Sequence, residues 1–417
     1  MSTPHLPSVY LGPDHGMWRP KAWQDVVDAQ QGGLLDESHW LDLKRELTPG
    51  RQGNQDLAVD IAAMALDSGQ LLYGMEDRES RAINVCGVEL AGLAERIDQV
   101  ARSKVHPPVL VRTIEIPDPN RAGWGCVLVL VPASSQAPHM VDNIYYGRGD
   151  KANHRLSDEE VRRAMAARDR RPHDVEEQLG RLRDEDPTGE GRKAGHLYLV
   201  AQPLASGAEA MVALTAHPSP QSTLQPMVHE IVQRLPQTYS PTLATAIRAS
   251  RRADGLALSS HSPDDRIYEG GLIDLVLRED GGIAMTCGRG TDIMSRGGLD
   301  PIRVVVPVVL LGLTHSALML AGLLAERHTA YQGAWAVGLL VDRLKATEPS
   351  DRIQSGWHGG TAYSRDEYVR TTETTTAELA DSSENVVQRL LGTLLRGLAV
   401  DVRYLPYTAS SLRNAAR

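Results

Sequence analysis

The feature that most restricts the fold of this chain is an uncharged, largely apolar run from Val304 to Ala325. A helix of about 20 apolar residues can cross a bilayer, so the run fits either a membrane span or a buried core helix. One proline, two glycines and two hydroxyl side chains interrupt it, and no aromatic belt flanks it. We therefore expect a core helix over residues 301–327, with Asp300 as its N-cap and Pro301 in its first turn, and no membrane contact.

Length, charge and cysteine content narrow the class of protein. A chain of 417 residues exceeds what one hydrophobic core usually supports, so two domains are expected. The formal net charge of -9 means that any nucleic-acid surface must be a local basic patch. The three cysteines form no CxxC pair, which argues against a disulfide framework or a zinc site. Because the first residues lack a basic start and an apolar run, we expect a cytoplasmic protein.

Strand and helix patterns alternate through the first 170 residues. Alternating or β-rich apolar runs predict strands, apolar residues at helical spacing predict helices, and Ser157 with Glu160 forms a capping box that opens a further helix. The expected strands are 40–46, 70–74, 109–116, 124–131 and 144–148, and the expected helices are 54–66, 88–103 and 157–168. This order is typical of a mixed α/β (α+β) fold.

The charged, apolar-poor segment 168–193 reads as a partly helical linker. We therefore divide the chain into an N-terminal extension (1–30), a first domain (31–170), a linker (171–193) and a second α/β domain (194–417). The second domain contains the long apolar helix, and its role is that of a sensor, effector or dimerisation domain. Its expected strands are 196–202, 255–259, 272–277 and 283–287, and its expected helices are 225–234, 301–327 and 384–398.

The segment Glu37–Leu47 (ESHWLDLKREL) interleaves two leucines with Asp42 and Lys44. In a strand, this spacing sends the leucines to a core and places the acid and the lysine together on the other face. Glu76 and Asp77 follow the next predicted strand. Converging carboxylates would suit Mg²⁺ or Mn²⁺, and a neighbouring lysine would bind phosphate or orient water. A solvated strand face explains the same spacing, so the pattern alone leaves both interpretations open.

A basic segment with two tyrosines offers a candidate nucleic-acid surface. Arg148, Lys151 and Arg155 would contact phosphate, and Tyr146 would stack on a base. Arg45, beside Lys44, is a further candidate. A hairpin with solvated cations and core tyrosines is the alternative interpretation.

Other signals carry less weight. No GxxxxGK[ST] loop occurs, so ATP binding lacks its usual sequence support, and no GxSxG nucleophile motif occurs. His139 and His315 are each expected to be structural, with His315 a core histidine of the long apolar helix. Residues 357–360 (WHGG) are expected to form a loop.

Several motifs together resemble one known family. ESHWLDLKREL, NQDLAVDIAAMALDSGQLLYGMED, VCGVE and PHMVDNIYYGRGDKANHRLSDEEVRR follow one another as in the Schlafen AlbA-type domain, over about residues 30–170. The resemblance implies a metal-dependent endoribonuclease that acts on transfer or ribosomal RNA through three carboxylates. Carried over by position, these are Glu37, Asp42 and Asp77 (or Glu76), with Lys44 as the family's lysine.

This sequence departs from the family pattern at some of those positions. Asp42 stands where Glu is usual, Leu43 replaces an aromatic residue, and Leu66–Gln70 replaces an Asn-Thr-x-Gly-Gly turn. The cysteine and histidine zinc site of animal members cannot be built here.

Three hypotheses follow from the residues and the resemblance. The first is a divalent-metal-dependent endoribonuclease acting on structured RNA such as tRNA, with a role in stress or phage defence. The second is a DNA- or RNA-binding regulator without catalysis, and the third is a protein-interaction module. Family nucleases pair two copies of the domain, so we expect a homodimer, with helix 301–327 contributing to its interface.

Overall fold

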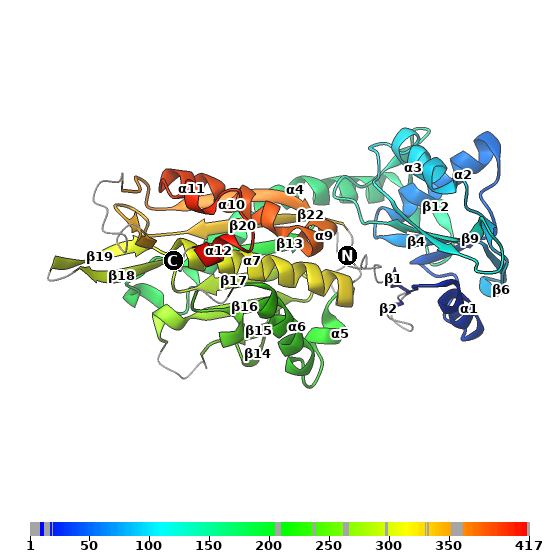
Figure 1. Ribbon diagram of the computed structural model, residues 1–417. Helices are drawn as coiled ribbons and strands as arrows, with labels where there is room; N and C mark the ends of the chain where they lie inside the picture. The colour runs from blue at the N-terminus through cyan, green and yellow to red at the C-terminus, as the bar shows by residue number, and fades with distance from the viewer. Residues whose placement is uncertain are drawn as a thin grey trace. The chain divides into compact units, whose positions relative to one another are not determined.

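The computed structural model describes residues 9–11, 17–18, 20–204, 210–236, 239–261, 267–296, 299–329, 331, 333–351 and 362–414. The chain divides into two compact units (Figure 1). The N-terminal unit comprises Met1–Arg171 with Leu204–Gly207 and Ala325–Ala334, and the C-terminal unit comprises the remainder. Both units mix helices and sheets, as the sequence predicts. The predicted loop at 357–360 lies outside the described residues.

The N-terminal unit is built on a five-stranded sheet with the order β3-β4-β9-β7, in which β8 also pairs with β9. β3 and β4 are parallel, and β9 runs antiparallel to β4, β7 and β8. A parallel pair needs a crossover connection, and α2 supplies it. The bounds are β3 Leu41–Lys44, α2 Gly50–Met64, β4 Gly69–Tyr73, β7 Val88–Glu89, α3 Leu93–Ser103, β8 Arg112–Pro117 and β9 Trp124–Val131.

Each face of this sheet covers its own hydrophobic core. On one face, α2 and α3 pack on Leu71, Tyr73, Val127 and Val129. On the other face, a second core gathers Leu41 and Leu43 of β3 with residues of three N-terminal elements, namely β1 (Val9–Tyr10), β2 (Met17–Trp18) and α1 (Trp23–Gln31). Two small sheets complete the unit: β5 (Met75–Arg78) with β6 (Arg81–Val85), and β10 (Met140–Val141) with β11 (Ile144–Arg148) and β12 (Asn153–Arg155).

Helix α4 (Asp158–Asp184) begins at the predicted capping box, where the hydroxyl and amide of Ser157 donate to Glu160 Oε2 at 2.7 and 2.8 Å. It extends far beyond its predicted end near Arg168, and the division between the units falls inside it. Charged pairs at i,i+4 spacing stabilise its exposed first part, and Val175 and Leu179 in its second part are buried. The predicted linker is therefore mostly helix.

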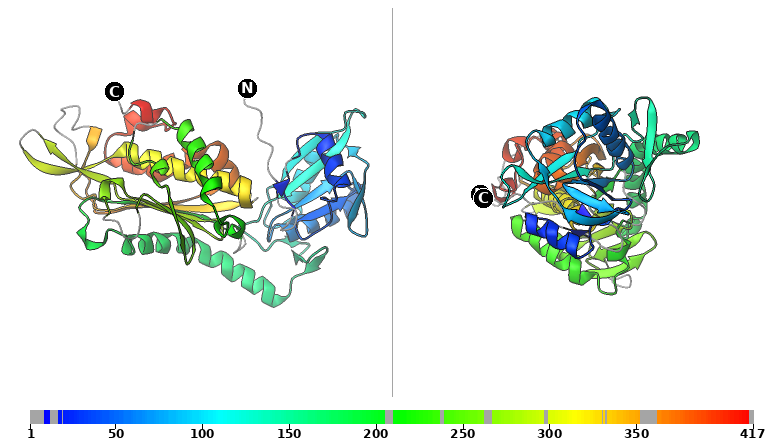
Figure 2. Two further views of the ribbon diagram at one scale, coloured as in Figure 1. Left: turned by 90° about the horizontal axis from the view of Figure 1, so that it is seen from below. Right: turned by 90° about the vertical axis from the view of Figure 1, so that its right-hand side faces the viewer.

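The C-terminal unit is built on a seven-stranded sheet with the order β14-β15-β16-β17-β13-β20-β22, antiparallel from β14 to β20. Helices α6, α7 and α10 lie on one face and the end of α4 on the other (Figure 2). Val175 and Leu179 of α4 approach Gly338 so closely that a Cβ there would lie within 3 Å of both side chains.

Strand β14 lies at one edge of that sheet, where no other described strand pairs with its outer side. The bounds of the strands are β13 Leu197–Pro203, β14 Arg248–Arg252, β15 Gly255–Ser259, β16 Ile273–Arg278, β17 Ile283–Cys287, β20 Ala334–Val341 and β22 Tyr368–Thr375. A small sheet adds β18 (Thr291–Arg296), β19 (Leu299–Val305) and β21 (Glu348–Pro349). The helices are α5 Val212–Thr215, α6 Gln221–Arg234, α7 Pro307–Leu324, α9 Thr376–Asp381, α10 Ser383–Gly397, α11 Asp401–Tyr404 and α12 Ser411–Asn414.

Helix α7 is the core helix of the C-terminal unit. With the π-turn that follows, the segment Pro307–Thr329 is long and apolar enough to span a membrane, yet 94% of its apolar window is buried inside the protein. This burial agrees with the predicted core helix and removes the helix from any exposed dimer interface. Its predicted start was wrong, because residues 299–305 form strand β19 and the helix begins at Pro307. The β-branched run Val304–Val306 explains the difference.

The two histidines expected to be structural are both buried. His315 lies between the hydroxyls of Tyr407 and Ser383, each 3.0 Å from a ring nitrogen, and burial lowers its pKa to about 4. His139 Nδ1 lies 2.7 Å from the carbonyl oxygen of Pro107.

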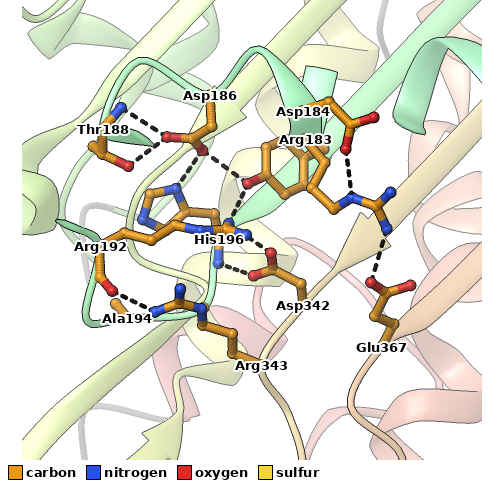
Figure 3. A network of polar contacts seen from close by, with 12 residues as sticks. Arg183, Asp184, Asp186, Thr188, Arg192, Ala194, His196, Asp342, Arg343 and Glu367 are labelled. Carbon is orange, nitrogen blue, oxygen red and sulfur yellow. Dashed lines mark hydrogen bonds and ion pairs between the residues drawn. The ribbon is translucent and has the colours of Figure 1, made fainter. Parts of the chain in front are cut away.

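A buried charge network fixes the start of β13 (Figure 3). We call it the His196 network; its members are Asp186, Arg192, His196, Tyr198, Glu269 and Asp342. His196 Nδ1 lies 2.7 Å from Asp186 Oδ2, and His196 Nε2 lies 3.0 Å from Glu269 Oε1. Tyr198 donates to Asp186 at 2.8 Å and accepts from Arg192 at 2.6 Å. The network ties the segment after α4 to the central strands of the sheet.

Candidate functional site

Strand β3 holds Asp42 and Lys44 on the face that α2 covers. Lys44 Nζ lies 2.8 Å from Asp42 Oδ2 and 3.3 Å from Oδ2 of Asp60, a residue of α2. The predicted alternation is confirmed, since Leu41 and Leu43 point into the opposite core. The acid face is not a wet strand face, however: Asp42 is 5% exposed and Asp60 is 7% exposed. Only Lys44, with 32% of its side chain exposed, leads from this cluster to solvent.

Arg148 of β11 is a structural part of the cluster. It is 6% exposed, and its guanidinium donates to the carbonyl oxygens of Ser38 and His39, each at 3.0 Å. A third contact places its Nη1 3.8 Å from Asp42 Oδ2. Because its donors are used inside the protein, the predicted phosphate contact by Arg148 is wrong.

Asn153 of β12 closes the cluster. Its amide accepts from Arg148 at 3.3 Å and donates to Asp60 Oδ1 at 2.6 Å. We call these five residues (Asp42, Lys44, Asp60, Arg148 and Asn153) the Asp42 network. It fastens the β11–β12 hairpin to both β3 and α2.

Glu37 lies at the edge of the Asp42 network. Its Oε1 accepts from the amide of Leu43 at 3.3 Å, and its carboxyl lies beside the side chains of Asp42 and Ser80. Burial and the neighbouring Asp42 carboxyl raise the pKa of Glu37. The structure therefore brings together two of the predicted acids, Glu37 and Asp42.

Asp60 is the site residue that the sequence analysis missed. Burial is the main cause that raises its pKa to about 6, while Lys44 and Asn153 oppose the shift. The signal for it was present: Leu57 and Met64 are core residues of α2, and Asp60 falls between them at i+3 and i-4 on the same face. A carboxylate on the apolar face of a helix is buried on folding, so it needs a hydrogen-bond donor or a cation nearby.

Lys44 keeps its charge in these surroundings. Burial disfavours the ammonium and is the largest single influence, but the attraction of Asp60 and Asp42 together outweighs it and raises the pKa of Lys44.

Glu76 and Asp77 do not join this cluster. Glu76 Oε1 lies 2.9 Å from Arg45 Nη1, and Glu76 Oε2 accepts from the amide of Asn84 at 3.0 Å. Asp77 is exposed on the β5–β6 hairpin, beyond a bulge. Among the described residues, no three His, Cys, Asp or Glu side chains are grouped to hold a metal ion. The carboxylates as arranged therefore do not fit a three-acid Mg²⁺ or Mn²⁺ site.

The surface beside the Asp42 network carries the remaining candidates. Lys151 and Arg155 are exposed on the β11–β12 hairpin, whereas Tyr146 is half-buried and packs on the core next to α2. His39 Nδ1 lies 3.0 Å from the carbonyl oxygen of Gly149, and its ring contacts Trp40 edge-on. Contact with Asp67 raises the pKa of His39 despite its partial burial. We call His39, Trp40, Lys151 and Arg155 the hairpin rim.

Comparison with protein families identifies the N-terminal unit. A mixed sheet with a helical crossover and a clamped β11–β12 hairpin underlies residues 37–157, and this segment matches the family model described as Schlafen, AlbA_2. The chain therefore contains a Schlafen AlbA_2 domain, as the resemblance predicts, which indicates a role related to nucleic acid. The C-terminal half has no family match.

Comparisons with whole proteins add little. No curated protein matches the chain. Among solved structures, the DIP2311 protein from Corynebacterium diphtheriae is 14% identical, with 91% of this chain and 62% of that chain covered and a TM-score of 0.23. A score this low carries no argument about fold or function.

Proposed function

We propose that the N-terminal unit binds RNA or DNA through the hairpin rim without cutting it. The observation that carries this proposal is the burial of Arg148, which fastens the β11–β12 hairpin to the Ser38–Leu41 segment. His39 contacts the hairpin at Gly149, close in the chain to the exposed Lys151, and Arg155 is exposed on the following strand. Cations that contact phosphate beside an aromatic ring that can stack on a base are the elements of single-strand recognition.

The state of the carboxylates supports binding without cleavage. Asp42 and Asp60 are buried against Lys44 and Arg148, and burial together with the neighbouring Asp42 carboxyl raises the pKa of Glu37. A nuclease site would instead keep its acids ionised and open toward the phosphate. We propose that this cluster positions the hairpin.

A charge-neutralisation experiment tests the proposal. The double variant Lys151→Gln/Arg155→Gln should bind a fluorescent tRNA or single-stranded oligonucleotide about tenfold more weakly, measured by anisotropy. The slope of log Kd against log salt should fall by about 1.5, since each lost phosphate contact removes about 0.7 to 0.9. The matched control is Arg162→Gln/Arg163→Gln, which removes two exposed cations from α4. Equal affinity of both double variants and the unmodified protein would refute the assignment of the rim.

A metal-dependent endoribonuclease is the second candidate. The contact between Glu37 and Asp42 beside Lys44 favours it, because these are three of the positions that the family resemblance assigns to catalysis. It would require Mg²⁺ or Mn²⁺ and a rearrangement that frees the carboxylates and brings in Asp77. Incubation of tRNA with purified protein and Mn²⁺ would then give discrete cleavage products. Loss of those products in both Glu37→Ala and Asp42→Ala, with RNA binding retained, would replace our first proposal by this one.

We further propose that the protein acts as a cytoplasmic homodimer. Its three free cysteines suit a reducing compartment, and a second copy would double the number of rims available to one RNA. Helix α7 is buried and does not supply the interface. Light scattering after gel filtration measures the mass directly, and a mass near 45.4 kDa at micromolar concentration would contradict the dimer.

A further inference from the structure

The N-terminal unit contains a cavity of about 690 Å³ that none of the Asp42 network lines. It lies where the parallel strands β3 and β4 end, between the β5–β6 hairpin, the start of α3 and the β8–β9 turn. Such carboxyl ends of parallel strands are a common place for ligands. Side-chain alternation separates the two places: Lys44 faces α2, and the next residue, Arg45, points into the cavity to meet Glu76.

A rigid stacking surface forms one wall of this cavity. The guanidinium carbon of Arg121 lies 3.1 Å from the centre of the Trp124 ring. The turn that carries them is fixed by a hydrogen bond from the amide of Trp124 to the carbonyl oxygen of Arg121 at 3.0 Å, and Gly123 supplies the left-handed residue with φ 77°. A guanidinium held over an indole can in turn stack on a third planar group, such as a nucleobase.

The other walls are polar and almost neutral in total charge. Arg45 pairs with Glu76, and Arg96 donates to the Asn54 side chain and to the carbonyl oxygens of Leu47 and Thr48. The lining holds three arginines (Arg45, Arg96 and Arg121) and three glutamates (Glu46, Glu76 and Glu89), so its formal charges cancel. A continuous phosphate backbone would find little net electrostatic attraction in such a cavity. Exposed carboxylates accept hydrogen bonds from the N–H edge of a base, in the way that Asp and Glu accept from an exocyclic amine.

The start of α3 adds a place for one anionic group. Its N-cap is Gly92, with φ 72° and no side-chain cap, and both Gly92 and Leu93 line the cavity. The amide of Leu93 donates to the carbonyl oxygen of Leu90 at 3.1 Å, so it is the helix dipole that favours a single negative charge here. This feature supports the assignment only together with the stacking surface.

We propose that the cavity binds one nucleotide, with its base stacked on Arg121 and Trp124, its N–H edge toward Glu46 or Glu89, and its phosphate near the start of α3. The nucleotide is either free or an unpaired residue of a bound strand. In the second case the inference rests on the proposed function.

Calorimetry with free 5′-GMP tests the cavity by itself. Trp124→Leu and Arg121→Gln should each weaken binding about tenfold, as expected when one base loses its stacking partner. Ribose 5-phosphate, which has the phosphate but no base, should bind more weakly than 5′-GMP. The matched control is Arg112→Gln, which removes an exposed arginine from the same pair of strands. Trp124→Phe keeps an aromatic ring and should retain most of the affinity, which separates loss of stacking from loss of folding.

An oligonucleotide arm distinguishes the two sources of the nucleotide. If a labelled single strand binds, and Trp124→Leu weakens it while Arg112→Gln does not, the strand supplies the nucleotide. If 5′-GMP binds but no oligonucleotide does, the cavity stands and the proposed function fails. If oligonucleotide binding occurs and neither Trp124→Leu nor Arg121→Gln changes it, while 5′-GMP does not bind, the cavity proposal is overturned and the proposed function is untouched. Absence of all binding overturns both.

Discussion

The two units each bury a network of charged side chains, and the two networks differ in one respect. In the Asp42 network, Lys44 keeps 32% of its side chain exposed, and the half-buried Glu37 stands beside it. In the His196 network, His196 and Tyr198 are 0% exposed. Both avoid the large cost of burying charge by pairing every acid with a donor. Lys44 is more exposed than any charged member of the His196 network, in which the side chain of Glu269 is 22% exposed and that of Arg192 is 14% exposed.

This difference helps to distinguish a network that takes part in function from one that only stabilises the fold. Burial alone would raise the pKa of Asp186, but hydrogen bonds from His196 and Thr188 outweigh it and hold that pKa well below its usual range. Asp60 is equally buried, yet its partners offset burial only in part, and its pKa stays raised at about 6. A fully compensated carboxylate indicates stability, whereas an under-compensated one indicates a place where function has been favoured over stability.

The largest effect should come from breaking the closed network. His196→Ala removes the ring that bridges Asp186 and Glu269 and leaves the buried Asp186 carboxylate with Tyr198 and Thr188 as its remaining donors. The free energy of unfolding should therefore fall by about 4 kcal/mol. Urea denaturation followed by circular dichroism measures it. The control, His229→Ala, removes an exposed histidine from α6. A loss below about 1 kcal/mol would mean that the network is not the anchor described here.

The second prediction concerns pH and the open network. The raised pKa of Asp60 means that the folded protein holds this proton more tightly than the unfolded chain does. Its contribution to stability therefore falls as pH rises from about 4 to about 6. Asp60→Asn cannot titrate, so between about pH 3.5 and pH 7.5 the unmodified protein should lose about 3 kcal/mol relative to the variant, at 1.36 kcal/mol per pKa unit. Parallel stability curves for the two proteins would contradict the assignment.

A conservative replacement tests the clamp on the hairpin. Arg148→Lys keeps the charge but cannot reach the carbonyl oxygens of Ser38 and His39 together, which leaves buried acceptors unpaired. The free energy of unfolding should fall by about 2 kcal/mol. Arg155→Lys, on the exposed part of the same hairpin, should leave it unchanged. Hydrogen exchange of the β11 and β12 amides reports whether the loss is confined to the hairpin, and global loosening would argue against a local clamp.

The smallest effect should appear in binding. The hydrogen bond to Asp67 raises the pKa of His39, so the ring loses its positive charge at a higher pH than an ordinary histidine does. RNA affinity should then fall roughly twofold, in line with about 0.5 kcal/mol for a surface charge. His39→Gln should show no such step in anisotropy titrations at constant ionic strength. An identical pH profile in the variant would exclude His39 from the rim.

Much of the fold follows from local sequence signals. Strands β9, β11, β15 and β17 span the predicted residues, because apolar, β-branched runs bounded by turn residues mark strand ends. The first residues of the helices were predicted less accurately from the sequence. Residues 88–89 form the short strand β7 rather than the first turn of α3, and residues 299–305 form β19 rather than the start of α7. Pairing with β9 holds residues 88–89 in a strand, and β19 pairs with the neighbouring strand β18 through a segment that ends in the β-branched residues Val304 and Val305.

The site was predictable only where its parts are neighbours in the chain. The contact between Asp42 and Lys44 follows from strand alternation. The bonds from Arg148 to Ser38 and from Asn153 to Asp60 join residues 110 and 93 positions apart. No local pattern encodes such contacts. A basic residue in a Gly-rich hairpin looks the same in sequence whether it faces phosphate or, as Arg148 does, the protein interior.

The open edge of the C-terminal sheet has a consequence for self-assembly. Strand β14 ends the sheet with the sequence RASRR. Arg252 is paired with Asp274, and Arg248 and Arg251 add positive charge along a row of backbone groups that no described strand pairs. A second molecule that approached this edge strand to strand would bring like charges together. Charge repulsion at this edge should therefore oppose the growth of extended β-aggregates at high concentration. Neutral replacements of these arginines should make the protein aggregate sooner in solution.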